Sequence, residues 1–203
     1  MPNSPAALTE EAVIGATKIW LERAVIGLNL CPFAKAVQIK NQIRYVVSAA
    51  RTQEQLVDDL AQELAFVAAA KPAQIDTTVL IHPYVLTDFL DYNDFLDVAD
   101  EVLEKLELDG TLQIASFHPQ YQFAGSEPDD IDNYTNRSPY PILHILREDS
   151  IERVVDAFPD TVDIYANNID TLRKLGHQGW QDLMQDGALI NQANQANLTD
   201  SKS

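Results

Sequence analysis

Histidines next to two predicted strands are the first residues whose type and spacing suggest chemistry. His82 follows the β-rich run 77–81, His118 follows the run 112–117, and a proline comes after each histidine. If these strands are parallel, both imidazoles emerge at one edge of the sheet, where open α/β sheets place their ligands. His144 lies near the start of the next strand, which begins at the same edge if it runs antiparallel. The sequence thus allows three of the four histidines to converge.

Three interpretations of these histidines stay open. In the first, His82, His118 and His144 bind a metal such as zinc or iron, although their spacing matches no short ligand motif. In the second, His118 is a catalytic acid or base beside an anion pocket, and His144 is a further catalytic candidate. In the third, each His-Pro pair only closes a strand, and its ring nitrogens bond to carbonyl groups of the loop.

A long connection, residues 119–140, separates the third predicted strand from the fourth and shows neither helical nor strand periodicity. Loops longer than roughly 12–15 residues are uncommon in compact domains and are usually functional or disordered. This one is rich in aromatic residues and prolines, which predicts an ordered loop that builds a site and faces the turn at residues 30–33.

Polar side chains in and after this loop are candidates for binding an anion. A planar guanidinium fork matches the geometry of phosphate and carboxylate groups. A salt bridge to a carboxylate of the same loop is the structural alternative for the arginines. The candidates are Asn136, Arg137, Ser138 and Arg147.

The single cysteine, Cys31, is the candidate nucleophile. Pro32 can open a short helix, which would place the sulfur near free backbone N–H groups, with Lys35 one turn further on. Both features favour the thiolate. Cys31 is therefore predicted to be a catalytic or redox-sensitive thiol. The most specific form of this prediction is a nucleophile–base pair of Cys31 with His118. A small buried hydrophobic residue is the alternative.

The elements that must position these residues alternate along the chain. Amphipathic patterns predict helices at 9–28, 52–70, 91–106, 151–158 and 168–175, and a short helix after Pro32. The run 162–165 fits either a strand or the start of a helix. β-rich runs predict strands at 43–47, 77–81, 112–117 and 142–146.

Strand–helix–strand units of this kind imply parallel neighbours joined by right-handed crossovers. We therefore expect an α/β fold, a two-layer sandwich with helices packed on a mostly parallel sheet of about four strands. The fourth strand is expected to be the antiparallel member. Residues 1–184 are expected to form a single domain. Residues 185–203, rich in Asn, Gln, Ala and Ser, are expected to form a flexible polar tail.

The acidic composition argues against several kinds of partner. With 14 basic and 31 acidic residues, the net charge of −17 would repel nucleic acid. No stretch approaches the roughly 18 apolar residues that suggest a membrane span, and the N-terminus lacks the pattern of a signal peptide. One cysteine permits no intrachain disulfide. We expect a cytoplasmic protein without nucleic-acid or membrane partners.

Four segments of the chain are long and specific enough to suggest a family. They are WLERAVIGLNLCPFA (20–34), DYNDFL (91–96), FHPQYQFAG (117–125) and NYTNRSPYPILHILRE (133–148). Together they resemble an uncharacterised bacterial family, domain of unknown function 1415. The resemblance extends to about residue 179 and implies a soluble bacterial protein. It brings no activity, substrate or cofactor.

These observations predict an enzyme or a binding protein for a small anionic molecule that carries a phosphate or carboxylate group. The predicted pocket lies at the strand ends, under the 119–140 loop. One alternative is a noncatalytic protein-interaction module with an acidic surface, and a second is a histidine-ligated metal-binding protein. The sequence specifies neither the reaction, nor a cofactor, nor the oligomeric state.

Overall fold

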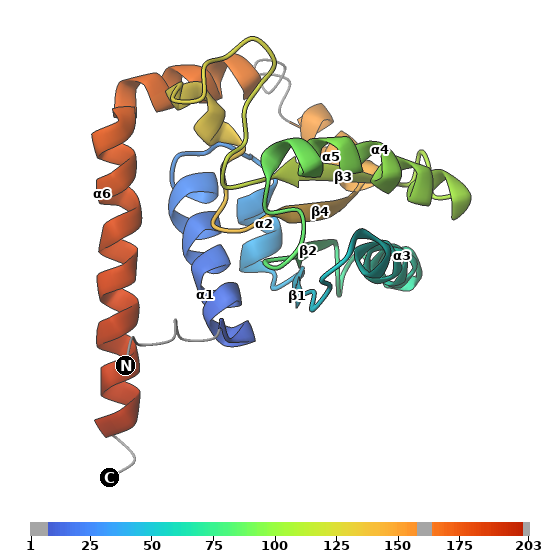
Figure 1. The fold of residues 1–203 in the computed structure, drawn as a ribbon, viewed down its shortest axis with the longest axis horizontal. Helices are drawn as coiled ribbons and strands as arrows, with labels where there is room; N and C mark the ends of the chain where they lie inside the picture. Colours follow the sequence, from blue (N-terminus) through green and yellow to red (C-terminus); the bar gives the residue numbers. More distant parts are fainter. Residues whose placement is uncertain (1–7, 158–163, 201–203) are drawn as a thin grey trace.

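The computed structural model describes residues 8–157 and 164–200, and a four-stranded sheet lies at its centre (Figure 1). β1 and β2 are parallel, whereas β4 runs antiparallel to both of its neighbours, β2 and β3. Three strands therefore share one direction, and the fourth is the antiparallel member, as predicted. The strand order is β1-β2-β4-β3, with β1 at Ile43–Val47, β2 at Thr77–Ile81, β3 at Leu112–Phe117 and β4 at Ile142–Arg147.

Two long helices, α3 (Gln53–Ala69) and α4 (Phe89–Lys105), cover one face of the sheet. α4 begins slightly earlier than the pattern predicts, because the Asp88 carboxylate caps it and accepts hydrogen bonds from backbone N–H groups of the first turn. The helix therefore starts at residue 89 and not at 91. The strand side chains that pack against this layer include Leu80, Leu143 and Ile145.

The opposite face is covered by α1 (Glu10–Trp20), its π-helical continuation η1 (Leu21–Ile26) and α2 (Ala34–Ile39). Helices therefore lie on both faces, which gives three layers where the sequence suggested two. The reason is that successive strand side chains point to opposite faces and are apolar on each side. Val79, Ile81 and Ile142 face this second helical layer.

The C-terminal part contains α5 (Glu148–Ala157), which follows β4 directly, and α6 (Ile164–Asp200), the long helix at the left of Figure 1. α6 bends at Gly176, whose φ of 67° suits glycine, and then resumes, whereas the sequence predicted its end there. Residues 185–200, predicted as a tail, continue this helix. The run 162–165 and the end of the predicted helix 151–158 lie partly outside the described residues.

The single-domain boundary at residue 184 stays a prediction. None of the described helices combines the length and the apolar character that a membrane crossing requires.

Candidate functional site

The 119–140 loop is ordered and is held by its own polar groups. Asn133 lies at its centre and is fully buried. Its side-chain oxygen accepts a hydrogen bond from the Phe123 N–H (3.0 Å), and its amide donates to the Glu127 carbonyl (2.8 Å). Arg137 donates to the carbonyls of Tyr121 (3.2 Å) and Pro128 (2.5 Å). Arg137 therefore uses its guanidinium on the loop backbone, and not on a carboxylate of the loop.

The loop packs on α6. Its short helix η2 (Ile131–Thr135) carries Tyr134, whose ring meets the rings of His177 and Trp180 edge-on at centroid distances of 5.5 and 5.1 Å. α6 also reaches the turn at residues 30–33, because the Asn168 amide donates to the Leu30 carbonyl (2.9 Å). The loop and the turn are thus both joined to α6.

Two further predicted ligand-binding residues also serve the loop. The Asn136 amide donates to the Ser116 carbonyl (3.0 Å), and the Ser138 hydroxyl donates to the Tyr140 carbonyl (2.6 Å). The first contact joins the loop to β3, and the second lies within the last residues of the loop. Both side chains therefore hold the loop itself.

His82 and His118 meet at the strand ends, on the face that α3 and α4 cover. Their rings pack against Tyr92 of α4, with centroid distances of 5.8 and 5.1 Å. His118 Nδ1 accepts from the Gln120 N–H (3.0 Å), so its Nε2 carries the proton and donates to the Leu86 carbonyl (3.2 Å). Burial lowers the pKa of His118 and lowers the pKa of His82 to about 4. The contacts of His118 are those of a residue that closes a strand.

His144 lies on the other face of the sheet. Its neighbours Leu143 and Ile145 face α3 and α4, so the strand alternation turns His144 towards α1 and α2. It therefore lies apart from His82 and His118. Among the described residues, no group of three or more His, Cys, Asp or Glu side chains is placed to hold a metal ion.

A cavity of about 480 Å³ lies on the face of the sheet that α1, η1 and α2 cover. This volume falls within the roughly 300–1,000 Å³ of small-molecule sites. Three predicted site residues line it, Cys31, His144 and Arg147. The cavity lies against the sheet face, and not under the loop where the sequence placed a pocket. The other predicted residues do not line it: Lys35, His118, Asn136, Arg137 and Ser138.

The inner walls of the cavity are apolar and aromatic. Trp20 and Phe117 meet edge-on at a centroid distance of 5.2 Å, and the Phe117 ring lies 6.1 Å from the His144 ring. Val79 and Ile142 form the floor from the sheet, and both are buried. Burial among these groups lowers the pKa of His144 to about 4, so the imidazole is neutral at pH 7.

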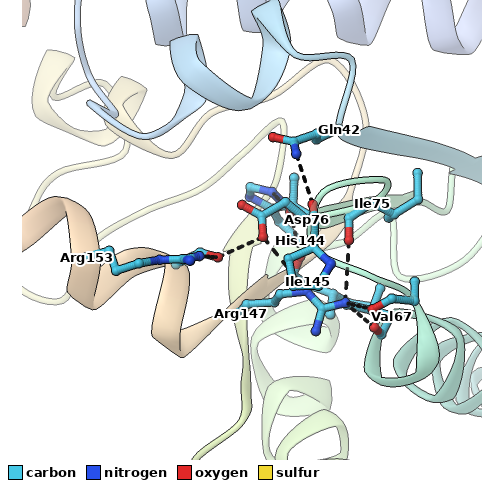
Figure 2. Close-up of polar contacts among 12 residues, drawn as sticks. Gln42, Val67, Ile75, Asp76, His144, Ile145, Arg147 and Arg153 are labelled. Atoms are coloured by element: carbon cyan, nitrogen blue, oxygen red, sulfur yellow. Dashed lines mark hydrogen bonds and ion pairs between the residues drawn. The ribbon is translucent and has the colours of Figure 1, made fainter.

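Arg147 stands at the polar end of the cavity, where Figure 2 shows it between the end of α3 and Asp76. Its Nη2 donates to the carbonyls of Val67 and Ala70, the latter at 2.7 Å, and its Nε lies 3.8 Å from Asp76 Oδ1. The last carbonyls of a helix have no intrahelical partner, and a cation there is favourable. Arg147 therefore acts first as a cap for α3.

Cys31 contributes its thiol to the cavity wall, but its environment opposes the thiolate. Burial raises the pKa of the thiol, and the backbone N–H groups of Phe33 and Ala34 only partly offset this effect. The predicted depression of its pKa is therefore wrong in direction. Lys35 is exposed on α2 and does not reach the cavity.

Sequence reasoning missed the other polar residues of the cavity. Asp76 accepts a hydrogen bond from the Ser150 hydroxyl (2.7 Å), and Arg153 donates to that hydroxyl (2.8 Å). Thr77 Oγ1 contacts His144 Nε2 at 2.7 Å. The register pairs Thr77 with Leu146, two residues from His144, so both side chains share one face. That register is the signal that sequence alone did not provide.

The fold and the cavity define an α/β protein with a ligand-sized chamber on one face of its sheet. The sequence model of a family described as a protein of unknown function, DUF1415, matches residues 12–182, and the chain belongs to this family. The resemblance of its sequence motifs is thereby confirmed. Neither a curated protein nor a solved structure matches the chain.

Proposed function

We propose that this protein binds a small amphipathic anion in the cavity, with the apolar part of the ligand inside and its phosphate or carboxylate group at the polar end. The observation that carries this proposal is a local reversal of charge. The chain has 31 acidic and 14 basic residues, yet the cavity is lined by three cations, Lys40, Arg147 and Arg153, and by one carboxylate, Asp76.

The apolar walls support an apolar ligand body. Trp20, Phe117 and Ile142 belong to the cluster that packs between the sheet and α1, and they also face the cavity. Small-molecule sites are typically lined by hydrophobic and aromatic side chains, with a few polar groups that fix orientation. Removing apolar ligand surface from water is favourable by about 25 cal/mol per Å². The walls would therefore supply most of the affinity.

The charges at the polar end support an anionic head. Asp76 and Arg147 offset one another, because their charged groups approach to 3.8 Å. Lys40 and Arg153 remain, both with exposed side chains at the rim. Two cations over a low-dielectric wall attract an anion, and the attraction weakens with salt. This arrangement fits a binding protein or an enzyme that acts on such a molecule.

The proposal can be tested by calorimetry and thermal unfolding with n-octanoate and n-octyl phosphate. A ligand that binds only the native state raises the melting temperature with concentration. We expect at least one of these anions to bind, and neutral n-octanol to bind less tightly. Added salt should weaken the binding of the anion more than that of octanol.

Charge reversal at the rim gives the matched control. Arg153→Glu and Lys40→Glu should each weaken anion binding about tenfold. Lys105→Glu changes the charge equally on helix α4, which covers the opposite face of the sheet and where Lys105 pairs with Glu101, and should leave binding unchanged. The proposal is wrong if neither anion binds, or if the α4 variant weakens binding as much as the rim variants.

A further inference from the structure

The wall of the cavity contains a histidine with one nitrogen in use and one without a protein partner. His144 Nε2 lies 2.7 Å from Thr77 Oγ1, and Thr77 Oγ1 lies 2.6 Å from the carbonyl oxygen of Ile145. Thr77 is buried in the cavity wall. The three groups form a short chain of hydrogen bonds on the cavity face of β2 and β4.

The number of protons in this chain fixes the tautomer of the imidazole. A carbonyl oxygen can only accept, so the single hydroxyl proton of Thr77 goes to Ile145. The Thr77 oxygen is then an acceptor towards His144, and Nε2 must carry the ring proton. Nδ1 is left with a lone pair. The lowered pKa of His144, about 4, keeps the ring neutral and preserves this arrangement at pH 7.

Among the described residues, the His144 ring makes its hydrogen bond through Nε2, to Thr77. No donor from these residues reaches Nδ1. The nearest ring is that of Phe117, which offers only carbon atoms. A polar atom in an apolar wall is unfavourable unless a partner satisfies it. Nδ1 is not among the sealed polar atoms of the described residues, so it is reached from the cavity, where a ligand can supply this partner in place of water.

We propose that the ligand of this cavity carries a hydroxyl or N–H group along its apolar part, and that this group donates a hydrogen bond to Nδ1 of His144. Hydroxylated amphipathic acids are the simplest class with this pattern. The role of His144 is recognition, because an imidazole this weakly basic does not remove a proton from an alcohol. Thr77 is a positioning residue, which holds the tautomer. This inference rests on the proposed function and narrows it.

The test compares n-octanoate with its hydroxy derivatives, 2-, 3- and 5-hydroxyoctanoate (the hydroxy isomers), in titrations at pH 7. We expect at least one hydroxy isomer to bind about tenfold more tightly than octanoate to the unaltered protein. His144→Phe keeps a planar ring but removes the acceptor, so it should abolish this preference while octanoate still binds. If octanoate binds and no isomer gains affinity, the inference is wrong and the proposed function stands. If none of the acids binds, the inference is wrong, and the proposed function is wrong as well if n-octyl phosphate also fails to bind.

A second test does not depend on the folding of the His144 variant, and its first readout needs no ligand. Long-range ¹H–¹⁵N spectra of the unaltered protein should show the His144 ring protonated at Nε2. Thr77→Val should let the Nδ1-protonated form appear and reduce the preference for the hydroxy isomer, and Thr77→Ser should restore both. A ring protonated at Nδ1 in the unaltered protein would overturn the inference.

Discussion

The two faces of the sheet use their histidines in opposite ways. On the α4 face, both ring nitrogens of His118 bond to the backbone, and the ring packs with His82 around Tyr92. On the α1 face, His144 bonds through one nitrogen to Thr77 and presents the other to a cavity. His82 keeps one nitrogen, Nε2, without a partner, but this nitrogen is buried and His82 does not line the cavity, whereas His144 does. A functional site is therefore better sought where unused hydrogen-bonding capacity borders a cavity than where histidines are most numerous.

The arginines repeat this contrast. Arg147 is buried and caps the end of α3, whereas Arg153 is exposed at the rim of the same cavity. Proximity to a cavity is therefore not enough to assign a ligand-binding role. The predictions below test which groups hold the fold and which remain available to a ligand, beginning with the largest expected effect.

Replacing Arg147 by methionine should give the largest loss of stability, about 3 kcal/mol. The change leaves helix-terminal carbonyls and the Asp76 carboxylate without their cation. Urea denaturation measures the loss. Arg153→Met, a matched change at an exposed site, should alter stability by less than about 0.5 kcal/mol. Equal losses in the two variants would show that Arg147 is no more structural than Arg153.

Acidification should destabilise the protein between about pH 6.5 and pH 4. The pKa values of His82 and His144 fall to about 4 in the folded state, so the unfolded chain, with pKa values of about 6.5, binds more protons in this range. The contribution of these neutral histidines to the free energy of unfolding is therefore fully present above about pH 6.5 and is lost as the pH falls towards 4. Each histidine contributes up to about 3 kcal/mol.

The pH dependence can be assigned to the two faces with variants. Urea denaturation at several pH values should show that the free energy of unfolding of His144→Phe depends less steeply on pH. The part of the dependence that comes from His82 should remain. His177→Asn, on the exposed surface of α6, is the control and should keep the full slope. An unchanged slope in His144→Phe would contradict a buried, neutral imidazole at this position.

Tyr92→Phe should destabilise the protein by about 2 kcal/mol and leave ligand binding intact. The buried Tyr92 hydroxyl donates to the Ile142 carbonyl (2.7 Å) and accepts from the Phe117 N–H (3.1 Å), and both groups would lose their partner. Tyr165→Phe, on an exposed ring, is the control. Thermal unfolding and the octanoate titration give both readouts. A large loss of binding with unchanged stability would mean that the α4 face contains the site.

The smallest expected effect concerns Cys31. Because burial raises the pKa of its thiol, iodoacetamide at neutral pH should react several-fold more slowly with the folded protein than with the urea-unfolded chain. Octanoate should slow the reaction further by filling the cavity. A folded protein that reacts faster than the unfolded chain would restore the activated thiol predicted from the sequence.

Much of the fold could be predicted from sequence. The bounds of β1, β2 and β3 were predicted to the residue, because short apolar runs are flanked there by residues that stop a strand. The start of α4 was misplaced because several aspartates near it can cap a helix, and the structure uses Asp88. The second helical layer was missed, although strands apolar on both sides are typical of a sheet covered twice.

The site was harder to predict because it depends on register and on distant contacts. The sequence grouped three histidines by their closeness to strand ends, but alternation along β4 places His144 on the opposite face. The role of Arg147 depends on carbonyl groups 77 and 80 residues away in the chain. Cys31, singled out from the sequence, lines the cavity, while the pKa of its thiol depends on burial that no local pattern reveals.

The most direct test of the contrast between the two faces is a long-range ¹H–¹⁵N spectrum of all histidine rings, recorded with and without the tightest-binding hydroxyoctanoate. Signals can be assigned with His82, His118 and His144 variants. We predict that the ligand shifts Nδ1 of His144 and leaves the nitrogens of His82 and His118 in place. A shift at His118 with no change at His144 would contradict the account and return the site to the strand ends.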